Sequence, residues 1–397
     1  MRYVLVTATG FPRWKGDTDS IYIYDLSRRL AEKGFRVSLL APHHPGAKKL
    51  EKVDGITIYR FPYFLEKFQK LAYEGGILEN IRKSWLARIQ VPFFVLFDFL
   101  ATRRVVKKEN PDIIHAHWIL PQGFIAYLMK RFYKTPYIVT AHAGDIFPLK
   151  SGLLKWFAGK AIDNARFCTA NSEYTGQAIR KISPKTNVLV IPMGVDLSDF
   201  SPKKKSAKLR KELNGDPIIL SVGRLAEKKG LKYLLLAMPD VIKSFPKAKL
   251  VIIGYGPLRQ GLENLAAKLN LKRNVVFLGE KKHKELPAHY ASADIFVAPS
   301  IVTKSGDTEG LGVVLLESLA SGTPVVGSNV GGIPDIIKHN KTGLLVEQKN
   351  PGQLANAMIR MLSDKKLRAG TVRNSTALLQ KSFSWEVIAD RFAKILK

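Results

Sequence analysis

The sequence predicts an α/β protein built from two Rossmann-like, doubly wound domains. Short runs of β-branched and apolar residues alternate with stretches of amphipathic, helical spacing along nearly the whole chain. The alternation restarts near the middle, and 397 residues are too many for one ordinary core, which favours two domains of about 200 residues. Strands that alternate with helices pair in parallel, and a ligand then binds in the crevice at their carboxyl ends.

The first domain is expected to begin with a strand rather than a signal peptide, because its apolar run is short and soon reaches Pro12 and Arg13. The helix that follows should end at Gly34, since glycine readily adopts the left-handed conformation that ends helices. Strands are expected at 3–7, 37–41, 56–60, 113–118, 137–140, 167–170 and 188–191. Helices are expected at 20–33, 78–88, 91–108, 123–133, 153–162 and in a short stretch that ends near 179–182.

The second domain repeats the pattern after a basic run from Lys203 to Lys211, which indicates a solvated linker or the end of a helix. Strands are expected at 218–222, 249–253, 275–278, 295–298, 324–327 and 343–346. Helices are expected at 233–244, 258–269, 286–291 and 385–396. The predicted division is an N-terminal domain over 1–197, a linker over 198–215, a C-terminal domain over 216–382 and a closing helix over 383–397.

The charge balance is strongly basic, with 63 Lys and Arg against 33 Asp and Glu and a formal net charge of +30. Such a surplus favours acidic partners, namely nucleic acid, an anionic membrane or a phosphorylated ligand. No nucleic-acid-binding module is visible, so nucleic acid is not expected as a partner. The single cysteine, Cys168, excludes an internal disulfide framework and fits a reducing cytoplasm.

Residues 61–110 break the alternation and hold ten aromatic residues, nine Lys or Arg and five Asp or Glu. Aromatic anchors beside cations are typical of a helix on a membrane surface, and they equally suit a helix whose aromatics pack against a domain. Both interpretations stay open. The longest apolar run, 91–100, is shorter than the ~18 residues of a membrane span and contains Asp98, so a soluble or peripheral protein is expected.

Two glutamates bracket the segment around which the second domain is organised. Glu309 and Glu317 enclose seven residues, and Gly310 and Gly312 fall at the expected start of an apolar helix. Bare N–H groups at a helix start bind anions. An unpaired carboxylate inside an apolar helix is costly, so Glu317 needs a partner unless it is solvated. The pattern predicts a site for a ligand with hydroxyl and phosphate groups.

A second motif, Gly223-Arg224 followed by Lys229-Gly230, comes directly after the first strand of the second domain. Loops at strand ends face the ligand crevice, so both cations could reach a diphosphate, although such a loop can also be merely solvated. The nearby Gly254 begins a segment that does not match the dinucleotide-binding fingerprint, because an arginine occupies the position of the third glycine.

Histidines at strand ends of the first domain are the remaining candidates. His115, His117 and His142 all lie at such ends, and Asp145 follows the last of them. We expect His142 with Asp145 to act through hydrogen bonds or as an acid–base group, with a structural role open for each histidine. No carboxylate or cysteine stands at zinc-ligand spacing, so no metal site is expected.

These motifs make the chain similar to retaining glycosyltransferases of the GT-B fold, in family 4, which includes mannosyl- and glucosyltransferases. Glu309 and Glu317 match the E-x7-E motif of that family, and Arg224 with Lys229 matches its R-x4-K element. Further segments that match, in the family's order, are 191–196, 318–326, 331–335 and 383–385. The chain departs from the family pattern at Asp17, Met193 and Asp335, where glycine, asparagine and glutamate are usual.

The resemblance implies a first domain that binds the acceptor, a second domain that binds a nucleotide-sugar across a cleft, and a closing helix that crosses back to the first. Arg224 and Lys229 would hold the diphosphate. Glu309 would contact the sugar hydroxyls, Glu317 the ribose, and His142 would lie beside the anomeric centre. The other donor-binding candidates are Gly16, Gly254, Leu278, Gly310, Leu311, Gly312 and Val313, and the acceptor-side candidates are His117 and Asp145.

The implied reaction transfers a hexose from an NDP-sugar, GDP-mannose or a UDP-hexose by preference, to a hydroxyl of a lipid-linked or cell-envelope glycan, with retention. No metal or other cofactor is expected, because Arg, Lys and helix N–H groups offset the charge of the diphosphate. The enzyme would be cytoplasmic and peripheral on the inner face of the membrane. A GT-B-like epimerase or phosphorylase is the nearest alternative; a non-enzymatic basic protein that binds nucleic acid or membrane is the alternative of another class.

Overall fold

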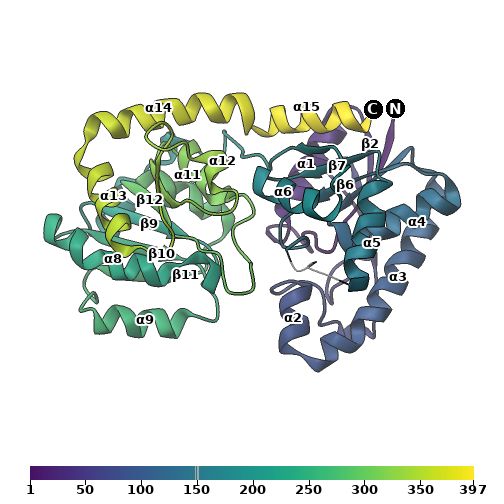
Figure 1. The fold of residues 1–397 in the computed structure, drawn as a ribbon, viewed down its shortest axis with the longest axis horizontal. Helices are drawn as coiled ribbons and strands as arrows, with labels where there is room; N and C mark the ends of the chain where they lie inside the picture. The colour runs from purple at the N-terminus through teal and green to yellow at the C-terminus, as the bar shows by residue number, and fades with distance from the viewer. Residues whose placement is uncertain (148, 150–151) are drawn as a thin grey trace. The chain divides into compact units, whose positions relative to one another are not determined.

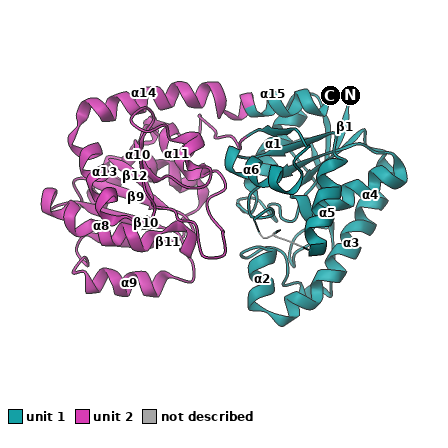
Figure 2. Ribbon diagram, viewed as in Figure 1, with its two compact units in different colours: residues 1–191, 388–397 teal, residues 192–387 magenta. Residues whose placement is uncertain are grey.

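The computed structural model describes residues 1–147, 149 and 152–397, and the chain forms two compact units (Figure 1, Figure 2). Unit 1 comprises Met1–Ile191 and Ile388–Lys397, and unit 2 comprises Pro192–Val387. Each unit holds one sheet, which is parallel throughout in unit 2 and parallel except for one edge hairpin in unit 1. The α/β class that the alternation of strands and helices predicts is therefore confirmed.

The sheet of unit 1 has eight strands in the order β3-β4-β2-β1-β5-β6-β7-β8. Their bounds are β1 Tyr3–Thr7, β2 Arg36–Pro42, β3 Leu50–Val53, β4 Ile56–Phe61, β5 Ile113–His117, β6 Tyr137–Ala141, β7 Phe167–Ala170 and β8 Val188–Val190. The strand order reverses between β1 and β5. In doubly wound sheets the carboxyl ends of strands at such a switch point are where ligands bind.

Sequence analysis does not predict the edge strand β3. Its four residues are largely exposed, so they carry no alternation of buried apolar positions. The strand pairs with β4 through the two-residue turn Asp54-Gly55, in which both residues have positive φ (46° and 79°). Asp-Gly is a preferred pair for that turn geometry, so the dipeptide is the signal that could have found this hairpin.

The helices of unit 1 follow the expected ranges except between residues 78 and 108. Their bounds are α1 Ile21–Glu32, α2 Ile77–Lys83, α3 Trp85–Glu109, α4 Phe124–Tyr133, α5 Gly152–Asp163 and α6 Glu173–Ile182, with single turns at η1 Glu66–Phe68 and η2 Ile119–Gly123. The break lies at Ser84 and not near residue 90, because the Ser84 hydroxyl accepts a hydrogen bond from the Ala87 amide and caps α3. Pro92 lies inside α3 without ending it.

Helix α3 is longer than the apolar run 91–100 on which the expectation of a soluble or peripheral protein rests. Among the described residues it is the one helix that is long and apolar enough to cross a membrane, judged by length and composition only. It has 25 residues, and the mean hydropathy of its most apolar window is 1.4. Its inner face is nevertheless tied to unit 1, because Asp98 accepts a hydrogen bond from Gln122 (2.9 Å) and Gln90 accepts one from the Lys70 amide (3.0 Å). Burial raises the pKa of Asp98 to about 8.

The sheet of unit 2 has six parallel strands in the order β11-β10-β9-β12-β13-β14. Their bounds are β9 Ile218–Val222, β10 Lys249–Ile253, β11 Val275–Gly279, β12 Ile295–Ala298, β13 Val325–Ser328 and β14 Leu344–Val346. The helices are α7 Ala207–Leu213, α8 Leu231–Ser244, α9 Arg259–Lys268, α10 Leu286–Ser292, α11 Val313–Ala320, α12 Ile333–Ile336, α13 Pro351–Ser363 and α14 Lys365–Ser382, with turns η3 Pro202–Lys204, η4 Glu227–Lys229 and η5 His283–Glu285. Its strand order reverses between β9 and β12.

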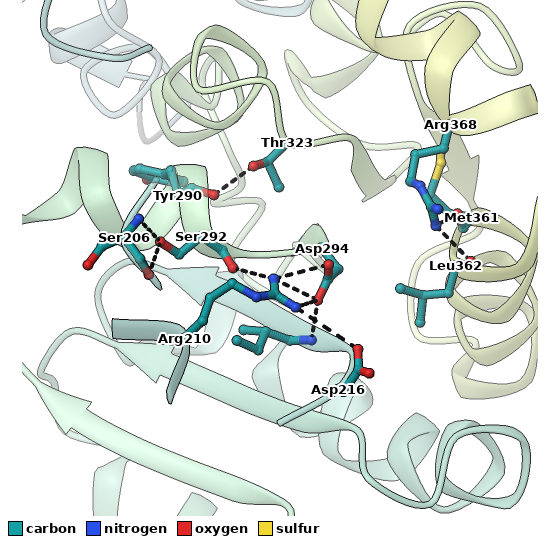
Figure 3. Close-up of polar contacts among 11 residues, drawn as sticks. Ser206, Arg210, Asp216, Tyr290, Ser292, Asp294, Thr323, Met361, Leu362 and Arg368 are labelled. Carbon is teal, nitrogen blue, oxygen red and sulfur yellow. Dashed lines mark hydrogen bonds and ion pairs between the residues drawn. The ribbon is translucent and has the colours of Figure 1, made fainter. Parts of the chain in front are cut away.

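The basic run expected to be a linker is part of unit 2. Arg210 of α7 donates to the Asp294 carboxylate (3.1 and 3.2 Å) and to the Ser292 carbonyl (2.8 Å) (Figure 3). The Ser206 amide donates to the Ser292 hydroxyl (3.0 Å), and Asp294 also accepts from the Ile218 amide (2.7 Å). The charge of this run predicts a solvated segment. The partners of Ser206 and Arg210 could not be predicted from the local sequence, because they lie far away along the chain.

The closing helix α15, Trp385–Leu396, is shared between the units, and Ile388–Lys397 belongs to unit 1. Asp390 forms an ion pair with Lys33, the residue that directly follows α1 (2.6 Å). The Phe392 ring lies 5.2 Å from the ring of His115 on β5. The helix therefore packs beside β5, the strand that carries His115 and His117.

Candidate active site

The strand-end loops of unit 2 form a pocket at the carboxyl ends of β9, β10 and β12. It is lined by Ser221, Val222, Gly223, Lys229, Leu231, Ile252, Ala298, Pro299, Ser300, Glu309, Gly312, Val314, Leu315 and Ile333. The pocket thus brings Gly223 and Lys229 of one predicted motif against Glu309 and Gly312 of the other. Lys229 and Glu309 are 80 residues apart along the chain.

Lys229 and Glu309 form an ion pair, with Nζ 2.5 Å from Oε2 and side chains only 20% and 17% exposed. Burial by itself would raise the pKa of Glu309, but the ammonium groups of Lys229 and Lys228 outweigh burial and hold the pKa below its ordinary value. Lys228 pairs with Asp307 at 3.2 Å, at a more exposed position. A phosphate group that approaches Lys229 therefore competes with Glu309.

Arg224 lies in the same loop as Lys229, one residue after Gly223, and is half-buried. The loop is anchored by Leu225, which is fully buried and whose amide donates to the Tyr255 carbonyl (2.8 Å). The anchor keeps Arg224 and Lys229 on one short segment at the end of β9. Two cations on one fixed loop suit the two phosphates of a diphosphate.

Glycines let the loops of the pocket touch through their backbones. A Cβ on Gly254 (φ 138°) would lie 2.0 Å from the Gly223 carbonyl oxygen, and a Cβ on Gly230 would lie 1.9 Å from the Pro299 carbonyl oxygen. No side chain fits either position. Gly254 therefore has a packing role under the Arg224 loop, and its predicted contact with the donor stays a prediction.

The loop that carries Glu309 rests on a second pair of glycines. A Cβ on Gly331 would lie 2.1 Å from the Glu309 carbonyl oxygen, and a Cβ on Gly332 would lie 2.2 Å from the Gly310 carbonyl oxygen. The Gly332 amide also donates to the Glu309 carbonyl (3.1 Å). The segment 331–335, which matches the family pattern, therefore supports the backbone beside Glu309.

Helix α11 begins at Val313, directly after Gly312, whose backbone is left-handed (φ 91°) and which has no side chain to cap the helix. The first N–H groups of an α-helix have no partner within the helix, and they carry a partial positive charge. Gly312 lines the same pocket as Lys229 and Glu309. A negatively charged ligand group in this pocket would therefore meet both a helix start and a lysine.

Glu317 lies in α11 and is 8% exposed, as its place inside an apolar helix indicates. Its Oε2 accepts a hydrogen bond from the hydroxyl of Tyr290 (2.7 Å), and its Oε1 lies 3.6 Å from His283. The partner that a buried carboxylate needs thus comes from the protein. Tyr290 could not be identified from the sequence, because it lies on another helix, α10, with no motif around it.

The donor-side candidates fall into three groups. Lys229, Glu309 and Gly312 line the pocket of unit 2. The candidates that lie on the surrounding loops or in α11 without lining it are Arg224, Gly254, Gly310, Leu311, Val313 and Glu317. Leu278 is half-buried on the edge strand β11, and Gly16 belongs to unit 1, so neither lines this pocket.

In unit 1 three histidines form a stacked cluster at the carboxyl ends of β5 and β6. Nδ1 of His117 lies 2.9 Å from Nε2 of His142, and the ring centroids of His115 and His117 are 4.1 Å apart. Burial lowers the pKa of His142 and of His115 to about 3, and it lowers the pKa of His117 well below its ordinary value. The lowered pKa values favour neutral imidazoles, and the hydrogen-bonding or acid–base role of His142 stays a prediction.

Asp145 holds the backbone around this cluster. Its carboxylate accepts hydrogen bonds from the amides of His142 (2.9 Å) and Ile119 (2.8 Å). Burial raises the pKa of Asp145 to about 6, although the backbone hydrogen bonds oppose that rise. The two strand-end segments are thereby joined beside His142, and both carboxylate oxygens of Asp145 already have partners.

Gly16 lies in the loop after β1 with a left-handed backbone (φ 89°), and a Cβ there would meet open space. The next residue, Asp17, replaces the usual second glycine of the family. Its carboxylate accepts hydrogen bonds from the amide and the Nε of Arg13 (2.8 and 2.7 Å). Asp17 therefore ties the loop back to Arg13. Its carboxylate also adds a negative charge where the family has a glycine, which makes the loop less suited to bind a phosphate.

The fold and the site together define a class. Two Rossmann-like units, one of which brings a lysine and a helix start together at its strand ends, have the GT-B fold. The structure is similar to that of sucrose-phosphate synthase from Thermosynechococcus elongatus, with a TM-score of 0.79 at 23% identity over 100% of this chain and 98% of that one.

The chain belongs to glycosyltransferase family 4. The family model "Glycosyltransferase Family 4" matches residues 20–199, and "Glycosyl transferases group 1" matches residues 203–378. The GDP-mannose-dependent alpha-(1-6)-phosphatidylinositol monomannoside mannosyltransferase of Mycobacterium tuberculosis is 33% identical over 100% of this chain and 98% of its own length. Alpha-monoglucosyldiacylglycerol synthase of Streptococcus pneumoniae is 26% identical over 99% of this chain and 84% of its own length. The protein is therefore a glycosyltransferase, and the non-enzymatic alternative is set aside.

Proposed function

We propose that the enzyme transfers a hexose from a nucleoside diphosphate sugar to a hydroxyl group of a lipid-linked or oligosaccharide acceptor, with retention and without a metal ion. The observation that carries this proposal is the pocket of unit 2, in which Lys229, Glu309 and the start of α11 meet. A cation beside helix amides suits a diphosphate, and a carboxylate beside both suits sugar hydroxyls. GDP-mannose is the first choice of donor, because a relative is named for it, and a UDP-hexose is the second.

Binding of the donor would exchange the partner of Lys229. The diphosphate would take the place of Glu309 at the ammonium group, and Arg224 would bind the second phosphate from the same loop. Glu309 would then accept hydrogen bonds from the hydroxyls of the sugar and orient the ring. The exchange balances charge, because one anion replaces another at Lys229 while the freed carboxylate gains neutral donors.

The transfer step breaks the bond between the anomeric carbon and the phosphate oxygen. The acceptor oxygen forms the new bond on the same face, and its proton passes to the leaving phosphate. Negative charge grows on the diphosphate as the bond breaks, and Lys229, Arg224 and the amides of α11 would stabilise it. No carboxylate nucleophile is required by this scheme.

Glu317 would bind the ribose of the donor. Tyr290 holds Oε2 of Glu317, which leaves Oε1, on the side of His283, to accept a hydrogen bond from a ribose hydroxyl. A buried carboxylate that already has one strong donor is held in a single orientation. The position of the nucleoside is thereby set relative to the diphosphate site.

In unit 1, His142 is the residue we propose to lie beside the anomeric centre. Its neutral imidazole can offer a hydrogen bond without adding a positive charge next to a cationic transition state. The candidates His117 and Asp145 are already engaged with the ring and the backbone amide of His142. We therefore propose that they position His142, and that other residues of unit 1 contact the acceptor.

We further propose a cytoplasmic enzyme that works peripherally at the inner face of a membrane. Two relatives are named for acceptors or products built on phosphatidylinositol and diacylglycerol, which are membrane lipids. A lipid-linked acceptor would stay in the bilayer while the donor arrives from the cytoplasm. The enzyme would then have to bind both a soluble and a membrane-embedded substrate.

The test is a donor screen by thermal stabilisation, followed by transfer to a lipid extract. We expect one of UDP-, GDP- or ADP-hexose to raise the melting temperature of the wild type, and transfer to continue in excess EDTA with retention of configuration in the product. The variant Glu309→Gln should bind the nucleoside diphosphate and lose transfer. Inversion, loss of activity in EDTA, or wild-type rates in Glu309→Gln would contradict the proposal. An epimerised sugar or a sugar 1-phosphate as the product would instead indicate an epimerase or a phosphorylase.

A further inference from the structure

A row of exposed apolar side chains runs along the outer face of α3 in unit 1. Its members and their exposed fractions are Trp85 70%, Ile89 47%, Phe93 41%, Leu96 51%, Phe97 40% and Leu100 41%. The positions recur every three or four residues, so they share one side of the helix. We call this row, together with the cations described next, the α3 face.

The same side of the helix continues into cations beyond Leu100. Arg103, Arg104, Lys107 and Lys108 are all exposed and, with Leu100, line an open groove of about 390 Å³. The one acidic residue between Trp85 and Lys108 is Asp98, which is buried on the inner side. The α3 face therefore presents apolar groups at one end and positive charge at the other. Glu109, the last residue of α3, lies 3.6 Å from Lys108, but its side chain is only 13% exposed and it also pairs with Arg36.

The inner side of α3 packs against the core of unit 1 and leaves the outer side largely exposed. Phe94 packs against the rings of Phe61 and Tyr63, with centroids 5.4 and 5.2 Å apart. The aromatics of residues 61–110 thus divide between the two interpretations left open by the sequence: some build the core, and others face outward. Monomeric soluble proteins rarely expose a continuous apolar patch of this kind unless the patch binds something.

The apolar patch extends beyond the helix. The Phe64 ring contacts Phe93, with centroids 5.6 Å apart, and Phe68, which is 50% exposed, accepts a hydrogen bond from Gln90 of α3 through its carbonyl. Leu65, between them, is 69% exposed. The segment around η1 therefore widens the patch next to α3.

We propose that the α3 face docks unit 1 onto an anionic phospholipid membrane. The apolar stretch from Trp85 to Leu100 would lie in the boundary between headgroups and acyl chains along about 24 Å. Arg104, Lys107 and their neighbours would bind lipid phosphates, which charge complementarity favours over a neutral surface. The helix lies on the membrane without crossing it, because its inner side is bonded to unit 1. The proposal is independent of the donor and of the reaction.

Vesicle flotation with the full-length protein tests the proposal. We expect binding to vesicles with 30 mol% phosphatidylglycerol, and at least tenfold weaker binding to pure phosphatidylcholine or in 0.5 M salt. The variant Arg104→Glu/Lys107→Glu should lose about tenfold in binding to the anionic vesicles. The variant Phe97→Gln/Leu100→Gln should lose a similar factor, and its residual binding should be fully sensitive to salt.

Matched controls in unit 2 separate a docking face from general stickiness. Lys203→Glu/Lys204→Glu changes the net charge by the same amount on exposed residues, and Tyr255→Gln/Leu258→Gln removes exposed apolar groups, 51% and 40% exposed in the native chain. Both controls should float like the wild type. Equal losses in the controls, or a wild type that fails to float, would overturn the proposal. So would sedimentation showing a dimer that the α3-face variants dissociate, because the occupant would then be a second copy of the chain.

Discussion

The pocket of unit 2 and the histidine cluster of unit 1 differ in the charge state of their ionisable side chains. In unit 2, Glu309 and Lys229 are both charged, and each offsets the cost of burying the other. In unit 1, burial lowers the pKa of His115 and also that of His142, whose side chain is half-buried, and both shifts favour the neutral imidazole. The region that we propose binds a charged diphosphate keeps exchangeable charge, whereas the region that we propose lies beside the anomeric centre excludes it.

The largest expected effect on activity comes from removing the charge of Lys229 in the pocket of unit 2. Lys229→Met should lower kcat/KM at least a hundredfold, because one of the two cations proposed to bind the diphosphate is lost and Glu309 is left without its partner. Nucleoside diphosphate binding should weaken at least tenfold by calorimetry, or about 1.4 kcal/mol. The control is Lys228→Met, next to it in the loop and paired with Asp307, which should change affinity by less than about threefold. Equal effects in the two variants would contradict the assignment of Lys229.

A smaller effect is expected when the support of Glu309 is disturbed while its charge is kept. In Gly332→Ala the new Cβ would meet the Gly310 carbonyl oxygen at 2.2 Å, so the loop must shift. We expect about a tenfold loss of kcat and about 1–3 kcal/mol of lost stability, which are typical costs of overpacking. Gly370→Ala in α14 is the control, because nothing lies within 4 Å of a Cβ there. Wild-type kcat in Gly332→Ala would refute the supporting role of the glycine pair.

The neutral state of the histidine cluster in unit 1 can be tested through the pH dependence of stability. The pKa of His115 is about 3 in the folded protein against an ordinary value of 6.5, so the unfolded chain takes up the proton first as pH falls. Stability is therefore present above pH 6.5 and is lost on acidification, by about 2 kcal/mol for this residue between pH 7 and 5. Asp145 acts in the opposite direction, because its folded pKa of about 6 lies above its ordinary value.

Urea unfolding at pH 7 and pH 5 measures this effect. His115→Asn should reduce the loss of stability seen in the wild type on going to pH 5 by about 2 kcal/mol. His339→Asn, at an exposed position in unit 2, should leave the loss unchanged. The same loss in His115→Asn as in the wild type would show that the buried histidine does not contribute to acid sensitivity.

The smallest expected effect concerns the carboxylate inside α11. Tyr290→Phe removes the hydroxyl that donates to Glu317 and leaves a buried oxygen without that partner. Such a loss costs about 1–3 kcal/mol in unfolding free energy, and we expect donor affinity to fall about threefold as Glu317 loses its orientation. Tyr255→Phe, at an exposed position, should change neither value. Donor affinity and stability equal to the wild type in Tyr290→Phe would contradict the role proposed for the pair.

By itself, the sequence determined the two α/β units, most of their strands, and the segments that meet in the pocket of unit 2. It could do so because strand and helix periodicity are local properties, and because parallel connections force strand-end loops to one edge of a sheet. The buried state of Glu317 was readable for the same reason, since its neighbours leave no polar face on α11. The family motifs then supplied the reaction class.

Only the tertiary structure decided which partners those residues take. The pairing of Lys229 with Glu309, the hydrogen bond from Tyr290 to Glu317, and the docking of Arg210 on Asp294 join positions far apart along the chain. The tertiary structure also decided which aromatics of residues 61–110 are buried and which are exposed. Composition does not reveal which side of a helix such as α3 packs against a neighbour. The burial of a side chain and the partners it contacts are set by tertiary packing, and together they decide which groups are ionised at each site.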